Sequence, residues 1–233
     1  MVLLYNPPKI SYHKRKTEVI PMLATTKSYY DHRGPVLVKN LQSRHFEAYY
    51  CPDKASALAK ALELIPKGAT IGWGGCMSAE QIGLIEAVKA GEYTVIDRST
   101  GKTAEEVNAL MKKCLTSDVF ITGANGLSMD GQMVNIDGNG NRAAAIIYGP
   151  ESVIVIAGMN KVCDTVEAAF TRAKTVAAPV NNQRFDNDNP CKFTGTCAQC
   201  KSVTCICNHY VVTRHCRPAG RIKFILVGED LGF

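Results

Sequence analysis

Strand-length apolar runs alternate in this chain with amphipathic segments of helix length, and no other feature limits the fold as strongly. The helical segments carry apolar residues at every third or fourth position, as Leu58, Ala61, Leu62 and Ile65 do. Strands that are separated by helices pair in parallel through right-handed crossovers. The sequence therefore predicts a doubly wound α/β fold with a mostly parallel sheet, whose strands are expected at 46–50, 69–72, 93–96, 119–122, 153–157 and 221–227.

Turn and capping residues locate the ends of several elements. Asp53 is expected to cap one helix, and Thr103 with Glu106 forms a capping box before another. A further helix is predicted from about Ser78. The pair Asp130-Gly131 predicts a hairpin turn.

Two parts of the chain show little periodicity, namely the first thirty-odd residues and the segment from about 180 to 220. We expect a basic irregular arm over residues 1–34 and one α/β domain over 35–233, which includes a cysteine-rich insert at 181–220. The net charge of +6 is concentrated in the first fifty residues. A basic arm can bind nucleic acid or an acidic partner. The preferred interpretation is a solvated tail, and nucleic acid is not expected, because no motif for binding it accompanies the charge.

The composition is that of a globular protein. A hydrophobic content of 46% is ample for a packed core and excludes wholesale disorder. The longest apolar runs are too short to cross a bilayer, and the apolar stretch at the N-terminus is too short for the core of a secretory signal. We therefore expect a cytoplasmic protein with no membrane partner, and a homodimer is a further expectation.

Cysteine is concentrated near the C-terminus. The chain has ten cysteines and no visible export signal, a combination that indicates metal binding or reactive thiols in preference to disulfides. The Cys-x2-Cys pair lets two thiolates reach one ion from a tight turn. Four thiolates around one centre indicate zinc or an iron–sulfur cluster. If the centre is a cluster, we expect one with four irons. Unrelated buried thiols are the alternative. The preferred metal ligands are Cys191, Cys197, Cys200 and Cys207, with Cys205 as the competitor.

Glycine-rich loops follow three of the predicted strands, at 72–78, 123–126 and 158–161. If the strands are parallel, these loops emerge at one edge of the sheet, which is where ligands bind in open α/β folds. Glycines let main-chain N–H groups approach a ligand closely, and a helix starting near Ser78 adds its positive end, so an anion is expected. The candidate ligand-binding residues are Gly72, Gly74, Gly75, Ser78, Gly123, Asn125, Asn135, Asp137, Gly138, Gly140, Asn141, Arg142, Asn160 and Lys161.

Candidates for catalysis are few. Cys76 stands at the expected start of a helix, where a thiol can have a lowered pKa and act as a nucleophile. The preferred interpretation of Cys76 is a small residue that fits a crowded loop, because no histidine is near it in the sequence to act as a base. All five histidines lie outside the predicted strand-end loops, which argues against histidine-dependent acid–base chemistry there.

Several long motifs occur in an order that resembles the LUD (lactate-utilisation) domain family, in its short form. They are Phe46-Glu-Ala-Tyr-Tyr50, Ile71-Gly-Trp-Gly-Gly75, Tyr93-Thr-Val-Ile-Asp-Arg98, Asp118-Val-Phe-Ile-Thr-Gly123, Asp130-Gly131, Val134-Asn-Ile-Asp-Gly-Asn-Gly-Asn-Arg142, Val227-Gly-Glu-Asp-Leu-Gly232 and the cluster of cysteines that ends at Cys207-Asn208. The resemblance covers about Leu41 to the C-terminus. It departs from the family pattern at Cys76, where a hydroxyl residue is expected, and at Cys205, where a basic one is expected.

The resemblance implies a fold like that of the NagB/RpiA/CoA-transferase superfamily and a role near L-lactate oxidation beside iron–sulfur oxidoreductase subunits. Members of that superfamily that transfer CoA use a catalytic glutamate, and the nearest acidic candidates here are Glu229 and Asp230. The leading hypothesis is a component of an L-lactate utilisation system that binds a small anionic ligand and a four-cysteine metal centre. The alternatives are an isomerase or transferase acting on a phosphorylated sugar or acyl substrate with a structural zinc, and a non-catalytic assembly or regulatory subunit.

Overall fold

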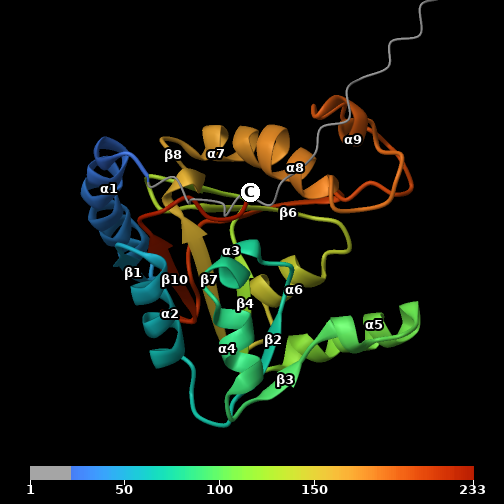
Figure 1. The fold of residues 1–233 in the computed structure, drawn as a ribbon, viewed down its shortest axis with the longest axis horizontal. Coiled ribbons are helices and arrows are strands. Elements are labelled where there is room, and N and C mark those ends of the chain that lie inside the picture. Colours follow the sequence, from blue (N-terminus) through green and yellow to red (C-terminus); the bar gives the residue numbers. More distant parts are fainter. Residues whose placement is uncertain (1–21) are drawn as a thin grey trace, which may run out of the picture.

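A six-stranded parallel sheet forms the centre of the protein, which a computed structural model describes over residues 22–233 (Figure 1). Every neighbouring pair of strands in this sheet is parallel, as the alternation of strands and helices predicts. The predicted α/β fold with a mostly parallel sheet is thus confirmed. In sheet order the strands are β1 (Glu47–Cys51), β10 (Ile222–Val227), β7 (Ser152–Gly158), β4 (Val119–Gly123), β2 (Thr70–Trp73) and β3 (Thr94–Ile96).

Helices cover both faces of this sheet. One face packs against α2 (Lys54–Glu63), α3 (Met77–Gln81) and α4 (Leu84–Ala90), and the apolar core on that side includes Ile71, Ile121 and Ile156. The other face packs against α1 (Ala24–Ser43) and α6 (Asn141–Ile147), with Phe120 and Phe224 fully or almost fully buried between them. Because both faces are buried, the central strands are almost wholly apolar and show no alternation with polar residues.

A second, four-stranded sheet lies beside the carboxyl edge of the first. Its order is β8 (Val162–Cys163), β5 (Gly126–Ser128), β6 (Met133–Asp137) and β9 (His209–Thr213). The predicted hairpin turn is confirmed, because β5 and β6 pair antiparallel and Gly131 between them has a φ of +87°. A long helical segment covers this sheet in the upper layer of Figure 1 and consists of α7 (Val166–Arg172), the π-helical turn Ala173–Ala177 and α8 (Ala178–Asn182).

The helix predicted from about Ser78 is two helices. Gly83 has a φ of +80° and separates α3 from α4. This left-handed conformation suits glycine, which has no Cβ to clash. Asp53 and Thr103 do cap α2 and α5 (Ala104–Lys113), and their side chains accept hydrogen bonds from the main-chain N–H groups of Ser56 and Glu106.

The prediction of an irregular arm up to residue 34 is wrong for the part of it that the structure describes. Helix α1 begins at Ala24, so the expected domain boundary falls within a helix. Leu37 and Leu41 of α1 are fully buried in the core, and Gly34 lies directly against the ring of Tyr50. Residues 1–21 of the predicted arm lie outside the described residues.

The segment 181–220 also has more regular structure than expected. It contains α9 (Pro190–Thr194) and the edge strand β9, which pairs antiparallel with all of β6. Most residues of β9 are partly or fully exposed, so their side chains do not carry the apolar signal of a buried strand. The insert is therefore held to the domain by strand pairing in addition to any contribution of its cysteines.

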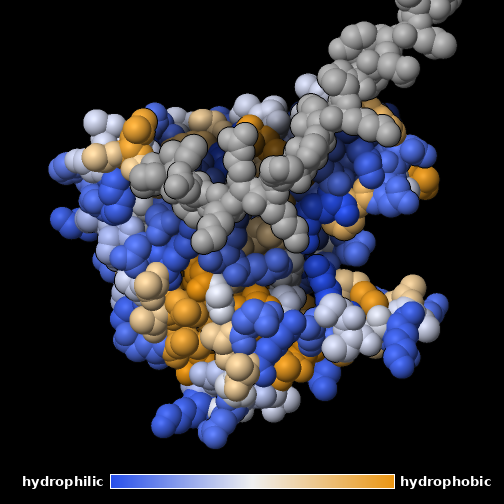
Figure 2. Space-filling view, viewed as in Figure 1, coloured by the Kyte–Doolittle hydropathy of each residue, from blue (hydrophilic) through white to orange (hydrophobic). Residues whose placement is uncertain are grey.

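The surface of the protein is mixed. On the face shown in Figure 2, hydrophobic residues gather between α2 and α4, and hydrophilic residues cover most of the remainder. In residues 22–233 no helix combines the length and the apolar character that crossing a bilayer requires.

Candidate functional site

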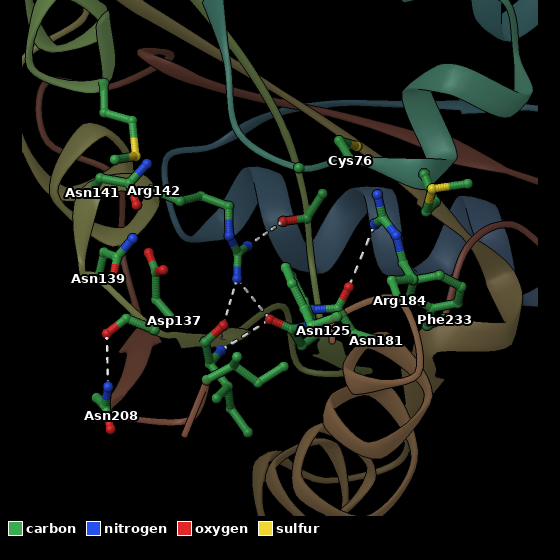
Figure 3. Close-up of a pocket in the computed structure, with 18 of the residues that line it drawn as sticks. Cys76, Asn125, Asp137, Asn139, Asn141, Arg142, Asn181, Arg184, Asn208 and Phe233 are labelled. Atoms are coloured by element: carbon green, nitrogen blue, oxygen red, sulfur yellow. Dashed lines mark hydrogen bonds between the residues drawn. The ribbon is translucent and has the colours of Figure 1, made fainter. Parts of the chain in front are cut away.

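Three loops meet at one edge of the large sheet. Strands β7, β4 and β2 are adjacent and parallel, so the loops that follow Gly158, Gly123 and Trp73 emerge at the same carboxyl edge. This arrangement, on which the predicted ligand site depends, is confirmed. A cavity of about 650 Å³ opens beside two of these loops and Lys161 of the third (Figure 3).

Eight of the residues predicted to bind a ligand line this cavity. They come from four separate parts of the chain, which the two sheets bring together. They are Gly75, Gly123, Asn125, Asp137, Gly138, Asn141, Arg142 and Lys161.

The other predicted residues lie behind the lining and support it. A Cβ at Gly72 would meet the Cys114 side chain, and one at Gly74 would meet the Arg142 side chain at 2.7 Å. Asn160 Oδ1 accepts a hydrogen bond from the main chain of Leu231. The residues outside the lining are Gly72, Gly74, Ser78, Asn135, Gly140 and Asn160.

Arg142 organises the floor of the cavity. Its Nη1 donates to the Gly123 carbonyl at 3.1 Å and to Asn135 Oδ1 at 2.6 Å, while its Nη2 donates to Asn125 Oδ1 at 2.9 Å and to the Ile136 carbonyl at 2.7 Å. Burial lowers the pKa of this guanidinium from its ordinary value. Because both terminal nitrogens bond to protein oxygens, Arg142 joins β4 to β6 and leaves mainly its positive charge to act on the cavity.

Lys161 is a buried amine in the cavity wall. Lys161 lies in the loop that follows β7, and it is 5% exposed. Its Nζ donates a hydrogen bond to Ser78 Oγ at 3.1 Å. Burial lowers the pKa of Lys161 to about 8. No Asp or Glu side chain of the described residues lies within ion-pair distance of it.

Cys76 and Asp137 are the other predicted titratable side chains of the lining. Cys76 is 4% exposed, and burial raises the pKa of its thiol, so the neutral thiol is favoured. Its Sγ accepts a hydrogen bond from the main chain of Ala79 at 3.4 Å. Asp137 Oδ2 accepts a hydrogen bond from the main chain of Ala143 at 2.7 Å. Asp137 is the only Asp or Glu that lines the cavity within the described residues.

Several further side chains line the cavity that were not predicted as site residues, among them Arg98, Arg184 and Phe233. Arg98 follows β3, a fourth strand that ends at the same edge of the sheet. Its position just after a predicted strand was the feature of the sequence from which its place in the cavity could have been inferred. Arg184 donates to Asn181 Oδ1 and lies with its guanidinium carbon 5.9 Å from the ring centre of Phe233 (Figure 3). Arg184 and Phe233 reach the cavity only through the packing of α8 and the C-terminal segment, which no local pattern reveals.

The two acidic candidates for catalysis are engaged elsewhere. Glu229 accepts a hydrogen bond from the main chain of Lys54 at 2.9 Å and forms an ion pair with its Nζ at 3.0 Å. Asp230 accepts a hydrogen bond from the Tyr30 hydroxyl at 2.8 Å. Neither side chain lines the cavity, and both tie the C-terminal segment to helices of the domain.

A second cavity, of about 360 Å³, holds the cysteine cluster. It is lined by all four preferred metal ligands and by their competitor, Cys191, Cys197, Cys200, Cys207 and Cys205, together with Tyr210, Phe170 and Lys174. Burial raises the pKa of Cys207 to about 12, with the neighbouring thiols adding to the effect. No three His, Cys, Asp or Glu side chains within residues 22–233 are grouped as metal ligands, so a formed metal loop is not confirmed. Thiolates bound to zinc lie about 2.3 Å from the ion, so a metal would draw four of these sulfurs closer together.

The solved structures that are similar to this chain include two of low sequence identity. A DUF162 family protein from Deinococcus radiodurans is 10% identical with a TM-score of 0.46, and the match covers 86% of this chain and 97% of that one. Ribose 5-phosphate isomerase A from Methanocaldococcus jannaschii is 16% identical with a TM-score of 0.33, over 50% of this chain and 56% of that one. No curated protein matches the sequence.

The family profile described as LUD domain matches residues 35–227. This range includes the whole parallel sheet, three of the loops at its carboxyl edge and the cysteine cluster. The chain therefore belongs to the LUD domain family, which is associated with lactate utilisation.

Proposed function

We propose that this protein is a component of an L-lactate utilisation system that binds an anionic ligand at the carboxyl edge of its parallel sheet. The observation that supports this most directly is Lys161, a buried amine in the cavity wall that has no carboxylate partner among the described residues. Burying a positive charge is costly unless an opposite charge accompanies it. A bound carboxylate or phosphate supplies that charge.

The rest of the lining has the same preference. Arg98, Arg142 and Arg184 add three guanidinium groups, against the single carboxylate of Asp137. Arginine binds carboxylates and phosphates through paired N–H groups, and Arg98 and Arg184 have donors left for such contacts. Side-chain amides of Asn125, Asn139, Asn141, Asn181 and Asn208 line the same cavity and can orient the remainder of the ligand.

We further propose that the cysteine cavity holds a metal centre, either an iron–sulfur cluster or zinc. Five thiols line this cavity, which is more than the four that one centre requires, and thiolates suit soft metals. Cys191, Cys197, Cys200 and Cys207 would hold the centre. When bound, zinc would cross-link and stabilise the insert, and an iron–sulfur cluster would also accept and donate single electrons.

Thermal unfolding in the presence of L-lactate, pyruvate, inorganic phosphate and sugar phosphates tests the anion site. We expect carboxylates or phosphates to raise the midpoint and neutral analogues such as glycerol to leave it unchanged. Stabilisation by sugar phosphates alone would favour the isomerase or transferase alternative. Absence of stabilisation by any anion would remove the basis of the proposal.

Anaerobic purification followed by metal analysis and a visible spectrum tests the metal centre. A brown protein with iron and sulfide indicates a cluster, and a colourless protein with stoichiometric zinc indicates a structural site. A folded protein that contains neither metal contradicts this part of the proposal.

A further inference from the structure

Lys161 differs from an ordinary anion-binding lysine in its surroundings. Its Nζ has one side-chain hydrogen-bond acceptor, Ser78 Oγ at 3.1 Å, and the other charged groups acting on it are the guanidinium groups of Arg172 and Arg142. These two arginines disfavour its protonated form, as burial does, and only Cys76 acts in the opposite direction. A desolvated lysine beside other cations is the arrangement that makes an amine nucleophilic in enzymes.

Burial and the two arginines together lower the pKa of Lys161 from 10.5 to about 8. At pH 8 about half of the amine is then neutral, and this neutral fraction is about 100 times larger than that of an ordinary lysine. Only the neutral form has a free electron pair. The surroundings therefore supply a nucleophile near physiological pH without a histidine or glutamate beside it.

Two glycines let the main chain pack closely around this amine. A Cβ at Gly123 would lie 3.1 Å from Cys76 Sγ and 4.0 Å from Lys161 Nζ, and a Cβ at Gly232 would lie 3.0 Å from the same Nζ. Gly123 and Lys161 both belong to the cavity lining. Lys161 thus combines a side chain that is 5% exposed with a place in the wall of the proposed ligand site.

We propose that Lys161 forms an imine with the carbonyl group of an anionic ligand, either a 2-oxo acid or an aldehyde that carries a phosphate. This inference rests on the proposed anion site, which selects the acid group, and adds that the ligand has a reactive carbonyl. The neutral amine attacks the carbonyl carbon and forms a C–N bond, while the π electrons of the carbonyl move to its oxygen. That oxygen takes up protons and leaves as water, which gives the imine. No oxidant or reductant is needed, and hydrolysis reverses the reaction.

Reductive trapping tests this directly on the full-length protein. Pyruvate with sodium cyanoborohydride represents the 2-oxo acids, and pyridoxal phosphate with sodium borohydride represents the aldehyde phosphates, each followed by peptide mass spectrometry. We expect a stable adduct on the peptide that contains Lys161, and at least a tenfold decrease in labelling when excess inorganic phosphate is present. Whichever of the two probes, pyruvate or pyridoxal phosphate, labels Lys161 at the lower concentration identifies the type of ligand.

Two variants provide the comparison. Lys161→Arg keeps the positive charge but removes the nucleophile, so it should lose the adduct on this peptide. Lys67→Arg changes an exposed lysine outside the cavity and should label as the wild type does. The pH dependence of wild-type labelling needs no variant, and the half-maximum for Lys161 should lie near pH 8.

Labelling spread over surface lysines, without protection by phosphate, would overturn the inference. If anions still raise the thermal midpoint in that case, the anion site stands and only the imine chemistry fails. If anions neither stabilise the protein nor protect Lys161, both proposals fail together.

Discussion

Asn208 donates a hydrogen bond from its Nδ2 to the carbonyl oxygen of Gly138 over 3.1 Å. Its main-chain N–H also donates to the carbonyl of Asp137 at 3.0 Å, directly before the strand pairing of β9 with β6 begins. The residue that follows Cys207 is thereby attached to a loop of the cavity proposed to bind an anion, here called the anion cavity. Cys205 and Ile206, just before it, line both the anion cavity and the cysteine cavity. The two candidate sites therefore share a wall.

Because of this shared wall, metal binding and anion binding should be coupled. Removing the metal with a chelator frees the segment around Cys205, and we expect the affinity for phosphate to decrease about tenfold, within the usual range of coupling between sites. Isothermal titration of metal-loaded and metal-free protein measures this. Asn208→Ala should weaken the coupling without removing a thiol. Equal phosphate affinities for the two folded forms would show that the sites are independent.

Replacement of Arg142 and Arg184 should separate structure from binding. Arg142→Ala removes four hydrogen bonds to protein oxygens, although Asn125 Oδ1 keeps a second donor, the main-chain N–H of Ile136. We therefore expect the free energy of unfolding to decrease by about 3–5 kcal/mol. Arg184→Ala removes an exposed side chain, so stability should change by less than about 0.5 kcal/mol while anion affinity falls. Urea unfolding and titration with phosphate measure both effects. Similar losses of stability in the two variants would contradict the structural role given to Arg142.

Lys161→Met should stabilise the protein and weaken anion binding. The lowered pKa of Lys161 means that its charged form is disfavoured in the folded state, and methionine removes a cost on the order of 3 kcal/mol below pH 8. Thermal unfolding at pH 7 should show the gain, and titration with phosphate should show the loss of affinity. If the Lys161→Met variant is less stable than the wild type, the charged amine of Lys161 is stabilised by its surroundings and the prediction is wrong.

The same pKa predicts how stability and binding depend on pH. Between about pH 8 and 10.5 the unfolded chain still holds the proton that folded Lys161 has released, so the contribution of this residue to stability rises with pH across that window. The affinity for anions should decrease as the pH rises through about 8, because Lys161 loses its positive charge. Titrations at a series of pH values measure this, and the step near pH 8 should be absent from Lys161→Met.

Serine substitutions should identify the thiols that bind the metal. Cys191→Ser, Cys197→Ser, Cys200→Ser and Cys207→Ser are each expected to lose most of the metal, whereas Cys205→Ser, which changes the residue in the shared wall, should keep it. Metal content after anaerobic purification is the measurement. Loss of metal from Cys205→Ser together with retention in Cys197→Ser would exchange the roles of these two cysteines.

Local patterns in the sequence determined the central part of the fold. The apolar runs predict all six strands of the parallel sheet within a residue or two, and Asp53 and Thr103 mark where two helices begin. The glycine loops lie at one edge because adjacent parallel strands end on the same side. These features depend on residues that are close together in the chain, so spacing alone reveals them.

The tertiary structure decided which of the candidate residues face a ligand. Glu229 and Asp230 look available in the sequence, yet contacts with Lys54 and Tyr30 hold them away from the cavity. Arg184 and Phe233 carry no motif, yet they line it. Both outcomes depend on packing between segments that are far apart in the chain. Burial and the positions of the contacting residues set the direction of each side chain, and local periodicity does not encode them.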